Sequence, residues 1–165
     1  MPELPEIQTI VNGLNRLITG RKILEITWNW AKSFPNSPEA VEATLGAVIV
    51  GARRRGKAVL IDLDNQTTLL VHLKMTGQLI VQEAGQTGPF PDKSTRVQFD
   101  FTDGSTLYFN DFRKFGWVRI MTPAELDQNA FLSKLGPEPL GRNFTRKVFQ
   151  ERMSRRKNTF VKAAL

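Results

Sequence analysis

The chain has 165 residues, of which 41% are hydrophobic and 24% are charged. This composition excludes a disordered protein, and the length fits one domain with a substantial core and room for an appendage. The sequence has no cysteine and one histidine, which excludes disulfides, thiolate metal sites and imidazole clusters, so we predict no metal site. No apolar run is long enough to span a bilayer, and the N-terminus lacks a secretory signal pattern, so we expect a cytoplasmic protein with no membrane partner.

The net charge of +7 is concentrated in the last part of the chain. Between Arg142 and Lys162 there are eight basic residues and one acid, Glu151, which accounts for the whole excess. Such a segment favours a polyanion partner, and the phosphate backbone of a nucleic acid is the first candidate. A second basic cluster, Arg53 to Lys57, supports the same interpretation. The alternatives are a solvated basic helix, or a face that an acidic part of a longer protein would cover.

In chain order, the first predicted element is an amphipathic helix from Pro5 to Leu17, which ends before Gly20. Eight short segments with strand patterns follow: Ile23–Trp30, Ala47–Ala52, Ala58–Leu63, Thr68–Leu73, Gln78–Gln82, Arg96–Phe101, Thr106–Phe109 and Trp117–Met121. Turn signals such as Asp103-Gly104 separate them, and the stretch from Glu83 to Ser94 is predicted to be a loop. Many short strands with close turns are typical of a sandwich or flattened barrel.

Beyond Thr122 the pattern is helical again. Four helices are predicted there, at Pro123–Gln128, Ala130–Leu135, Thr145–Arg155 and Thr159–Leu165. We therefore predict an α+β fold: an antiparallel β-sandwich preceded by an N-terminal helix and followed by C-terminal helices. Residues 1–135 would form the sandwich domain, and residues 136–165 would form a linker and the first helices of a second domain. Because the last helical pattern stops at Leu165 without a cap, we expect the chain to be truncated.

The first six residues suggest a nucleophile. Initiator methionine is generally removed before a small residue such as Pro2, which would leave a secondary amine as the terminus. An α-amino group titrates near ~8, so much of it is neutral in the cell. With Glu3 beside it and Glu6 one helical turn further on, such an amine is typical of Schiff-base chemistry with carboxylate acid/base catalysis. The alternative is ordinary helix punctuation, because Pro5, Glu3 and Glu6 all suit a helix N-terminus.

The opening Pro2 to Glu6 resembles that of formamidopyrimidine-DNA glycosylases, which excise oxidised purines and then cut the DNA strand. Further matches follow in the family's order: Arg54–Lys57, His72–Gly77, Asn110–Gly116 and Leu135–Leu140. The resemblance covers the whole chain but only part of the family's length. It implies that a helix-two-turn-helix domain and usually a four-cysteine zinc finger are missing. Zinc is therefore expected only in that absent finger, and no cofactor is expected in this chain.

The resemblance implies a catalytic role for four residues near the N-terminus and the basic cluster. Pro2 matches the nucleophile, Glu3 would exchange protons with the sugar, and Glu6 lies one helical turn away. Lys57 matches a lysine that contacts the target nucleotide and assists elimination. Its position after three arginines and a glycine would also fit a groove with cationic walls, although an exposed basic turn between two strands is an equal alternative.

The resemblance also implies DNA-binding residues. Met75, Arg113 and Phe115 match three side chains that, in the family, fill the space left by an extruded base. An apolar side chain and an aromatic one can enter the base stack as wedges, and a guanidinium can hydrogen-bond the orphaned partner base. His72, in the matching segment His72–Gly77, is also a candidate DNA-binding residue. The alternative for His72 and Met75 is a packing role, because a lone histidine or methionine after an apolar strand is more often a packing residue.

Phosphate contacts are implied for Lys157 and Lys162. Where the family usually has histidine, this chain has Ser94. A hydroxyl can still bond a phosphate, so Ser94 remains a candidate DNA-binding residue.

These observations predict a bifunctional DNA glycosylase and abasic-site lyase, or its catalytic portion. We expect it to act as a monomer on double-stranded DNA that contains oxidised purines or abasic sites. One alternative is the endonuclease VIII-like branch, which acts on oxidised pyrimidines, although Leu4 and the set of Met75, Arg113 and Phe115 favour the purine branch. Another is a damaged-DNA-binding fragment without catalysis.

Overall fold

The computed structural model describes residues 2–139, 141–155 and 159–160. The chain divides into two compact units, residues 1–128 and residues 129–165. The first unit contains α1 (Leu4–Leu17), β1 (Ile23–Trp28), the 3₁₀ turn η1 (Ala31–Ser33), α2 (Pro38–Thr44), β2 (Ile49–Arg55), β3 (Ala58–Leu63), β4 (Thr68–His72), β5 (Gly77–Gln82), β6 (Thr95–Phe101), β7 (Thr106–Asp111), β8 (Trp117–Met121) and α3 (Pro123–Asp127). The second unit contains α4 (Ala130–Ser133) and α5 (Arg146–Arg155).

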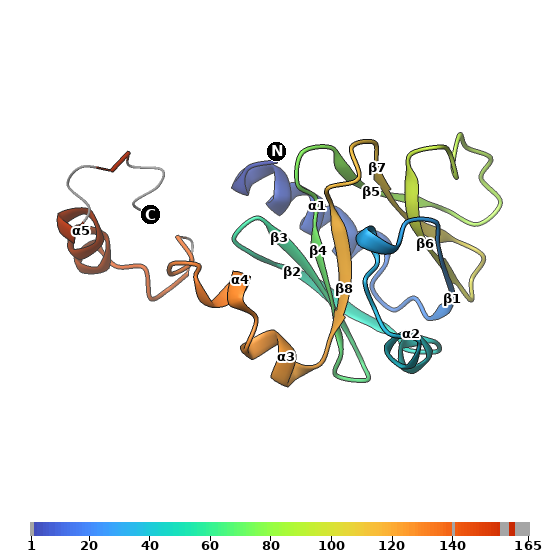
Figure 1. The fold of residues 1–165 in the computed structure, drawn as a ribbon, viewed down its shortest axis with the longest axis horizontal. Coiled ribbons are helices and arrows are strands. Elements are labelled where there is room, and N and C mark those ends of the chain that lie inside the picture. Colours follow the sequence, from blue (N-terminus) through green and yellow to red (C-terminus); the bar gives the residue numbers. More distant parts are fainter. Residues whose placement is uncertain (1, 140, 156–158, 161–165) are drawn as a thin grey trace. The chain divides into compact units, whose positions relative to one another are not determined.

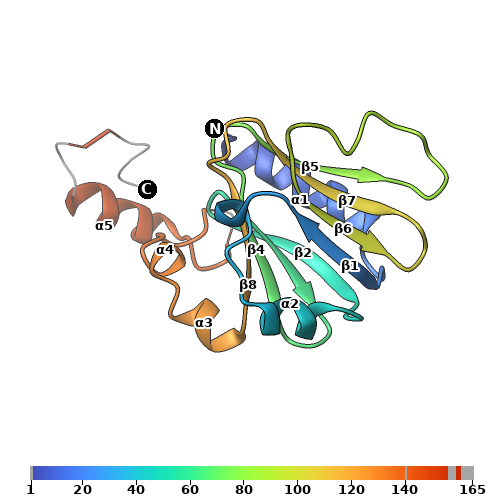
Figure 2. The same ribbon diagram turned by 45° about the vertical axis from the view of Figure 1, so that its right-hand side comes forward.

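The eight strands form two antiparallel sheets of four strands, in the orders β1-β6-β7-β5 and β2-β3-β4-β8. Figures 1 and 2 show the two sheets facing each other in the first unit. Successive side chains of a strand point to opposite faces, and the inward ones build one core that includes Ile61 of β3, Phe99 of β6 and Phe109 of β7. The predicted α+β fold, an antiparallel sandwich between an N-terminal helix and C-terminal helices, is confirmed.

Helix α1 lies against β2, an edge strand of its sheet. Its buried stripe is Ile7, Val11 and Leu14. An edge strand presents unpaired backbone groups, and the Asn15 amide satisfies two of them, because Nδ2 donates to Ala52 O at 2.7 Å and Oδ1 accepts from Ala52 N at 2.7 Å. This packing fixes the direction of α1 and brings its first turn toward the turn between β2 and β3.

Two short elements were not predicted from the sequence, η1 and α2. Helix α2 begins after Ser37, whose hydroxyl accepts from Ala40 N at 3.3 Å, and Pro38 occupies its first turn. Serine followed by proline is a helix-start signal, but seven residues are too few to show a clear period. The predicted helix Thr159–Leu165 lies mostly outside the described residues, and the domain boundary after residue 135 stays a prediction. Within the described chain, no helix is long and apolar enough to cross a membrane.

Candidate active site and nucleic-acid interface

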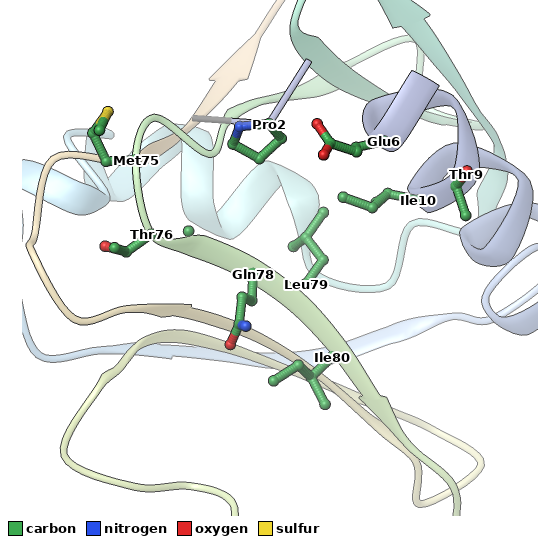
Figure 3. A pocket seen from close by; sticks show the side chains of 10 residues that line it. Pro2, Glu6, Thr9, Ile10, Met75, Thr76, Gln78, Leu79 and Ile80 are labelled. Atoms are coloured by element: carbon green, nitrogen blue, oxygen red, sulfur yellow. The ribbon is translucent and has the colours of Figure 1, made fainter. Parts of the chain in front are cut away.

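A cavity of about 690 Å³ lies between the start of α1 and the start of β5. Figure 3 shows the side chains that line it, with the Glu6 carboxylate directed toward Pro2 and with Met75 farther along the rim. The full lining is Pro2, Glu6, Thr9, Ile10, Met75, Thr76, Gly77, Gln78, Leu79 and Ile80. The structure therefore places two predicted catalytic residues and one predicted wedge residue around the same cavity.

The two carboxylates next to Pro2 are held by the N-terminus of α1. Glu3 is the N-cap residue of the helix, and the Glu6 carboxylate accepts a hydrogen bond from the Glu3 backbone N–H. Pro5 lies in the first turn, where its missing N–H is harmless. Glu3, Pro5 and Glu6 therefore do form the N-terminal cap and first turn of a helix, as the alternative interpretation expected. The same contacts also orient Glu6 toward the cavity, so a capping role of Glu6 is compatible with a catalytic one.

Lys57 reaches the N-terminal residues through space. Arg55 of β2 pairs with Ala58 of β3, so Gly56 and Lys57 form a two-residue hairpin loop between these strands. The positive φ of 56° at Gly56 suits such a loop. The Lys57 ammonium lies 2.9 Å from Glu3 Oε2. By contrast, the Arg53 guanidinium bonds the Asp62 carboxylate at 2.6 Å. Members of the predicted basic cluster therefore have different partners, with Lys57 paired to Glu3 and Arg53 paired to Asp62.

His72 is buried at the end of β4, opposite Ala58 of β3, with 4% of its surface exposed. Burial lowers the pKa of His72 from 6.5 to about 4, with further lowering by the charges of Lys74 and Lys57. The ring is therefore neutral at physiological pH. Its Nδ1 accepts from Lys74 N at 3.1 Å, so Nε2 carries the proton and is the donor of the ring. His72 is thus both a packed residue and an oriented hydrogen-bond donor.

Met75, Arg113 and Phe115 come from two turns that the fold brings together. Met75 lies between β4 and β5, whereas Arg113 and Phe115 lie between β7 and β8. The Arg113 backbone N–H donates to Thr76 Oγ1 at 3.1 Å, which joins the two turns. Met75 and Phe115 are 48% and 54% exposed, and the Arg113 guanidinium lies 4.9 Å from the Phe115 ring centroid. Neither large apolar side chain is a core residue, as their predicted wedge role requires.

Ser94 lies beside the second of these turns, because its backbone oxygen accepts from Asp111 N at 2.9 Å. Its hydroxyl donates to Asp92 Oδ1 at 2.7 Å, and this bond is the main reason that the pKa of Asp92 is lowered. The Ser94 oxygen can still accept a hydrogen bond, but its own proton is already used within the loop. The predicted phosphate contact of Ser94 stays a prediction.

The basic segment is partly described. In α5, Arg146, Lys147 and Arg155 are exposed, in keeping with a solvent-facing cationic helix. Lys157 and Lys162, the two predicted phosphate-binding lysines, lie outside the described residues. Among the residues that the structure does describe, no group of three or more His, Cys, Asp or Glu side chains could hold a metal ion.

Three further residues near the site were missed by sequence reasoning. Thr76 links the two turns, Asp111 is fully buried beneath them, and Phe112 is 70% exposed beside Arg113. The motif around Asn110 to Gly116 drew attention to Arg113 and Phe115 only. A buried aspartate at the end of a strand has no periodic signal, although its short polar side chain is typical of turn-forming residues.

Comparisons with known proteins identify a family that matches most of this chain. The family model described as the formamidopyrimidine-DNA glycosylase N-terminal domain matches residues 1–118. The chain is 37% identical over its whole length to a formamidopyrimidine-DNA glycosylase of Ligilactobacillus salivarius and 39% identical to one of Protochlamydia amoebophila. It covers 59% and 58% of these two relatives, so it spans about three fifths of their length.

Solved structures with the same fold include complexes with DNA. The Lactococcus lactis formamidopyrimidine-DNA glycosylase bound to DNA with an abasic site matches with a TM-score of 0.80 and 26% identity. That match covers 93% of this chain and 58% of the other. A MutM complex with DNA containing carbocyclic 8-oxo-G matches with a TM-score of 0.80 at 26% identity, over 93% of this chain and 57% of the other.

Proposed function

Because the chain belongs to the family of formamidopyrimidine-DNA glycosylase N-terminal domains, we propose that it is the catalytic portion of a base excision repair glycosylase. In this proposal it excises oxidised purines from double-stranded DNA and cleaves the resulting abasic site. The observation that carries the proposal is the cavity shared by Pro2, Glu6 and Met75, with the Glu3–Lys57 ion pair next to Pro2. The names of the relatives and the DNA-bound structural neighbours support it.

The first chemical step requires removal of Met1, which frees the Pro2 amine. The neutral amine forms a bond to C1′ of the extruded nucleotide while the bond from C1′ to the base breaks. The Glu3 carboxylate takes up the proton of the amine, and the departing base takes up a proton from water. Glu3 then donates a proton to the ring oxygen of the deoxyribose as the sugar opens. The product is an iminium ion between Pro2 and C1′.

This iminium makes strand cleavage possible. A secondary amine has no second proton to lose, so its adduct at C1′ keeps the positive charge. The charge acidifies the C2′ hydrogen, and loss of that proton expels the 3′ phosphate in a β-elimination. A second, δ-elimination expels the 5′ phosphate. Lys57 supports these steps because its ammonium lies 2.9 Å from Glu3 Oε2, within reach to return a proton to that carboxylate.

DNA binding and base extrusion would depend on residues other than the catalytic ones. Extruding a base costs a few kcal/mol in lost stacking and pairing, and exposed Met75 and Phe115 are available to occupy the vacated space. Arg113 would bond the orphaned base, and neutral His72 would donate from Nε2 to a phosphate oxygen. The basic residues after Arg142 would add contacts to the backbone. We propose that the protein does this as a monomer, without a cofactor.

The proposal is tested by trapping with borohydride on a duplex that contains an abasic site. Only an amine nucleophile gives an adduct that borohydride reduces to a stable covalent product, so we expect trapping by the chain with Pro2 at its terminus. The control is the same chain with an N-terminal extension, in which the Pro2 nitrogen is an amide. Absence of an adduct with free Pro2, or full trapping by the extended chain, would contradict the proposal.

A second assay separates the two branches of the family. The relatives' names and Leu4 favour oxidised purines, so we expect excision of 8-oxoguanine to exceed excision of an oxidised pyrimidine such as thymine glycol. The reverse preference would favour the endonuclease VIII-like alternative. DNA binding without excision of either base would identify a damaged-DNA-binding fragment.

A further inference from the structure

Asp111 is a fully buried carboxylate at the end of β7, with 0% of its surface exposed. Its Oδ2 accepts from Gly116 N at 2.6 Å, and its Oδ1 accepts from Arg113 N at 3.2 Å. Its backbone oxygen accepts from Arg96 Nε at 2.8 Å and from Lys114 N at 3.3 Å. Asp111 therefore fixes the whole turn from β7 to β8 from beneath. Because a buried charge is stable only when it is fully hydrogen-bonded, the turn and the carboxylate depend on each other.

Both turns that carry the wedge residues are conformationally restricted. Lys74 has a φ of 53° and Lys114 a φ of 59°, a region that non-glycine residues rarely adopt. A Cβ at Gly77 would lie 2.4 Å from Leu73 O, and one at Gly116 would lie 2.7 Å from Phe109 Cζ. Each turn is thus closed by a left-handed lysine and by a glycine that no larger residue can replace without a shift. These are specified shapes, unlike loops that adapt to their surroundings.

Thr76 connects the two turns. Its hydroxyl donates to Asp111 Oδ1 and also accepts from Arg113 N at 3.1 Å. Met75 is the neighbour of Thr76, and Arg113 is two residues from Asp111. We propose that Thr76 and Asp111 are positioning residues that hold Met75 and Arg113 at a fixed separation for base extrusion. This inference rests on the proposed function.

The exposed side chains on the two turns indicate that the bond between Thr76 and Asp111 serves DNA binding as well as folding. Phe112 and Phe115, on the turn that Asp111 organises, are 70% and 54% exposed, and Met75 on the other turn is 48% exposed. A rigid frame that holds three large apolar side chains in water is unfavourable unless another surface covers them. Stacked bases would be such a surface, and Arg113 and Lys114 supply positive charge that complements a phosphate backbone. A wedge has to keep its shape while it displaces a base, and the link between Thr76 and Asp111 supplies that stiffness.

The test compares three threonine variants in the full 165-residue chain. Thr76→Val removes the hydroxyl at nearly constant volume, and Thr76→Ser keeps it. Thr67→Val is the matched control, because the Thr67 hydroxyl bonds Asn65 Oδ1 at 2.7 Å in the turn between β3 and β4, at the opposite end of β4 from His72. Thr76→Ala replaces Thr76→Val if the valine, beside buried Asp111, prevents folding. Thermal unfolding establishes that each variant is folded.

The first readout is single-turnover excision at saturating enzyme. For Thr76→Val we expect excision of a paired lesion to slow about tenfold, as for loss of a hydrogen bond to a charged group. Cleavage of a pre-formed abasic site should change much less, since no base is extruded. Thr76→Ser and Thr67→Val should stay close to the parent chain. Equal losses of Thr76→Val on both substrates, or no loss on the paired lesion, would overturn the inference.

The second readout is amide hydrogen exchange without DNA. The Arg113 amide should exchange about tenfold faster in Thr76→Val than in the parent chain or Thr76→Ser, because one of its acceptors is lost. Unchanged exchange at Arg113 would overturn the inference whatever the activity. Failure of the parent chain to act on either substrate would refute the proposed function instead, so the two failures are distinguishable.

Discussion

The depressed pKa of His72 predicts a specific dependence of stability on pH. In the folded chain burial, together with the charges of Lys74 and Lys57, lowers this pKa from 6.5 to about 4. Between pH 6.5 and about pH 4, His72 is protonated in the unfolded chain and neutral in the folded chain. The free energy of unfolding is therefore constant for this group above pH 6.5 and falls as the pH drops from 6.5 toward 4. The loss is complete below the folded pKa.

The size of this effect follows from the shift. A change of the His72 pKa from 6.5 to about 4 sets an upper limit of about 3 kcal/mol on the loss in the free energy of unfolding. Burial is the largest cause of this shift, and the charges of Lys74 and Lys57 that add to it are screened by water and salt, so we expect a loss of ~1 to 2 kcal/mol. The pKa values of Glu39, Asp92 and Glu125 are also lowered in the fold. These carboxylates add a further loss at low pH, which a matched variant has to cancel.

The assay is urea unfolding of the parent chain and of His72→Asn at about pH 7 and about pH 4.5, which span most of the range in which the unfolded chain binds more protons than the folded chain. Asparagine keeps an acceptor close to the position of Nδ1, so the Lys74 N–H remains bonded, and it cannot titrate in this range. The parent chain should lose ~1 to 2 kcal/mol more than the variant between the two pH values. Equal losses in both proteins would refute the assignment of a buried neutral imidazole.

Three other predictions concern DNA. Phe115 is 54% exposed, so Phe115→Ala should fold normally. It should slow single-turnover excision of a paired lesion about tenfold or more, as for lost base stacking, while abasic cleavage is nearly unchanged; equal losses on the two substrates would contradict the wedge role of Phe115. Arg113→Ala should reduce the preference between bases opposite the lesion, measured as excision-rate ratios across the four pairs; unchanged ratios would remove that role. Joint replacement of Lys157 and Lys162 by alanine should reduce the slope of log affinity against log salt by roughly one to two; an unchanged slope would place both lysines away from the DNA.

The strands and α1 could be predicted from local pattern because burial imposes a period on them. In β6 the inward residues Val97, Phe99 and Phe101 alternate with partly exposed ones, and the stripe of α1 repeats at helical spacing. Helix α2 could not be predicted in this way, since only Val41 and Thr44 of its seven residues are buried. Local sequence shows a period only where an element is long enough to repeat it.

Candidate site residues could be proposed from the sequence, but Thr76 and Asp111 were missed and the contacts between the residues could not be predicted. The ion pair of Glu3 with Lys57 depends on how α1 packs on β2, which the Asn15 bonds to Ala52 help to fix. The link from Thr76 to Asp111 spans 35 residues and appears only when two sheet ends meet. Motifs identify chemically capable side chains, whereas distances between them arise from tertiary packing.

The central claim is that the Pro2 nitrogen is the nucleophile, and mapping the trapped adduct tests it most directly. The chain is reduced with borohydride on a duplex with an abasic site and then digested, and the modified peptide is located by mass spectrometry. The account predicts the sugar remnant on the Pro2 nitrogen of a chain that lacks Met1. Attachment to Lys57 or to any other lysine, or no attachment when Pro2 is free, would contradict it.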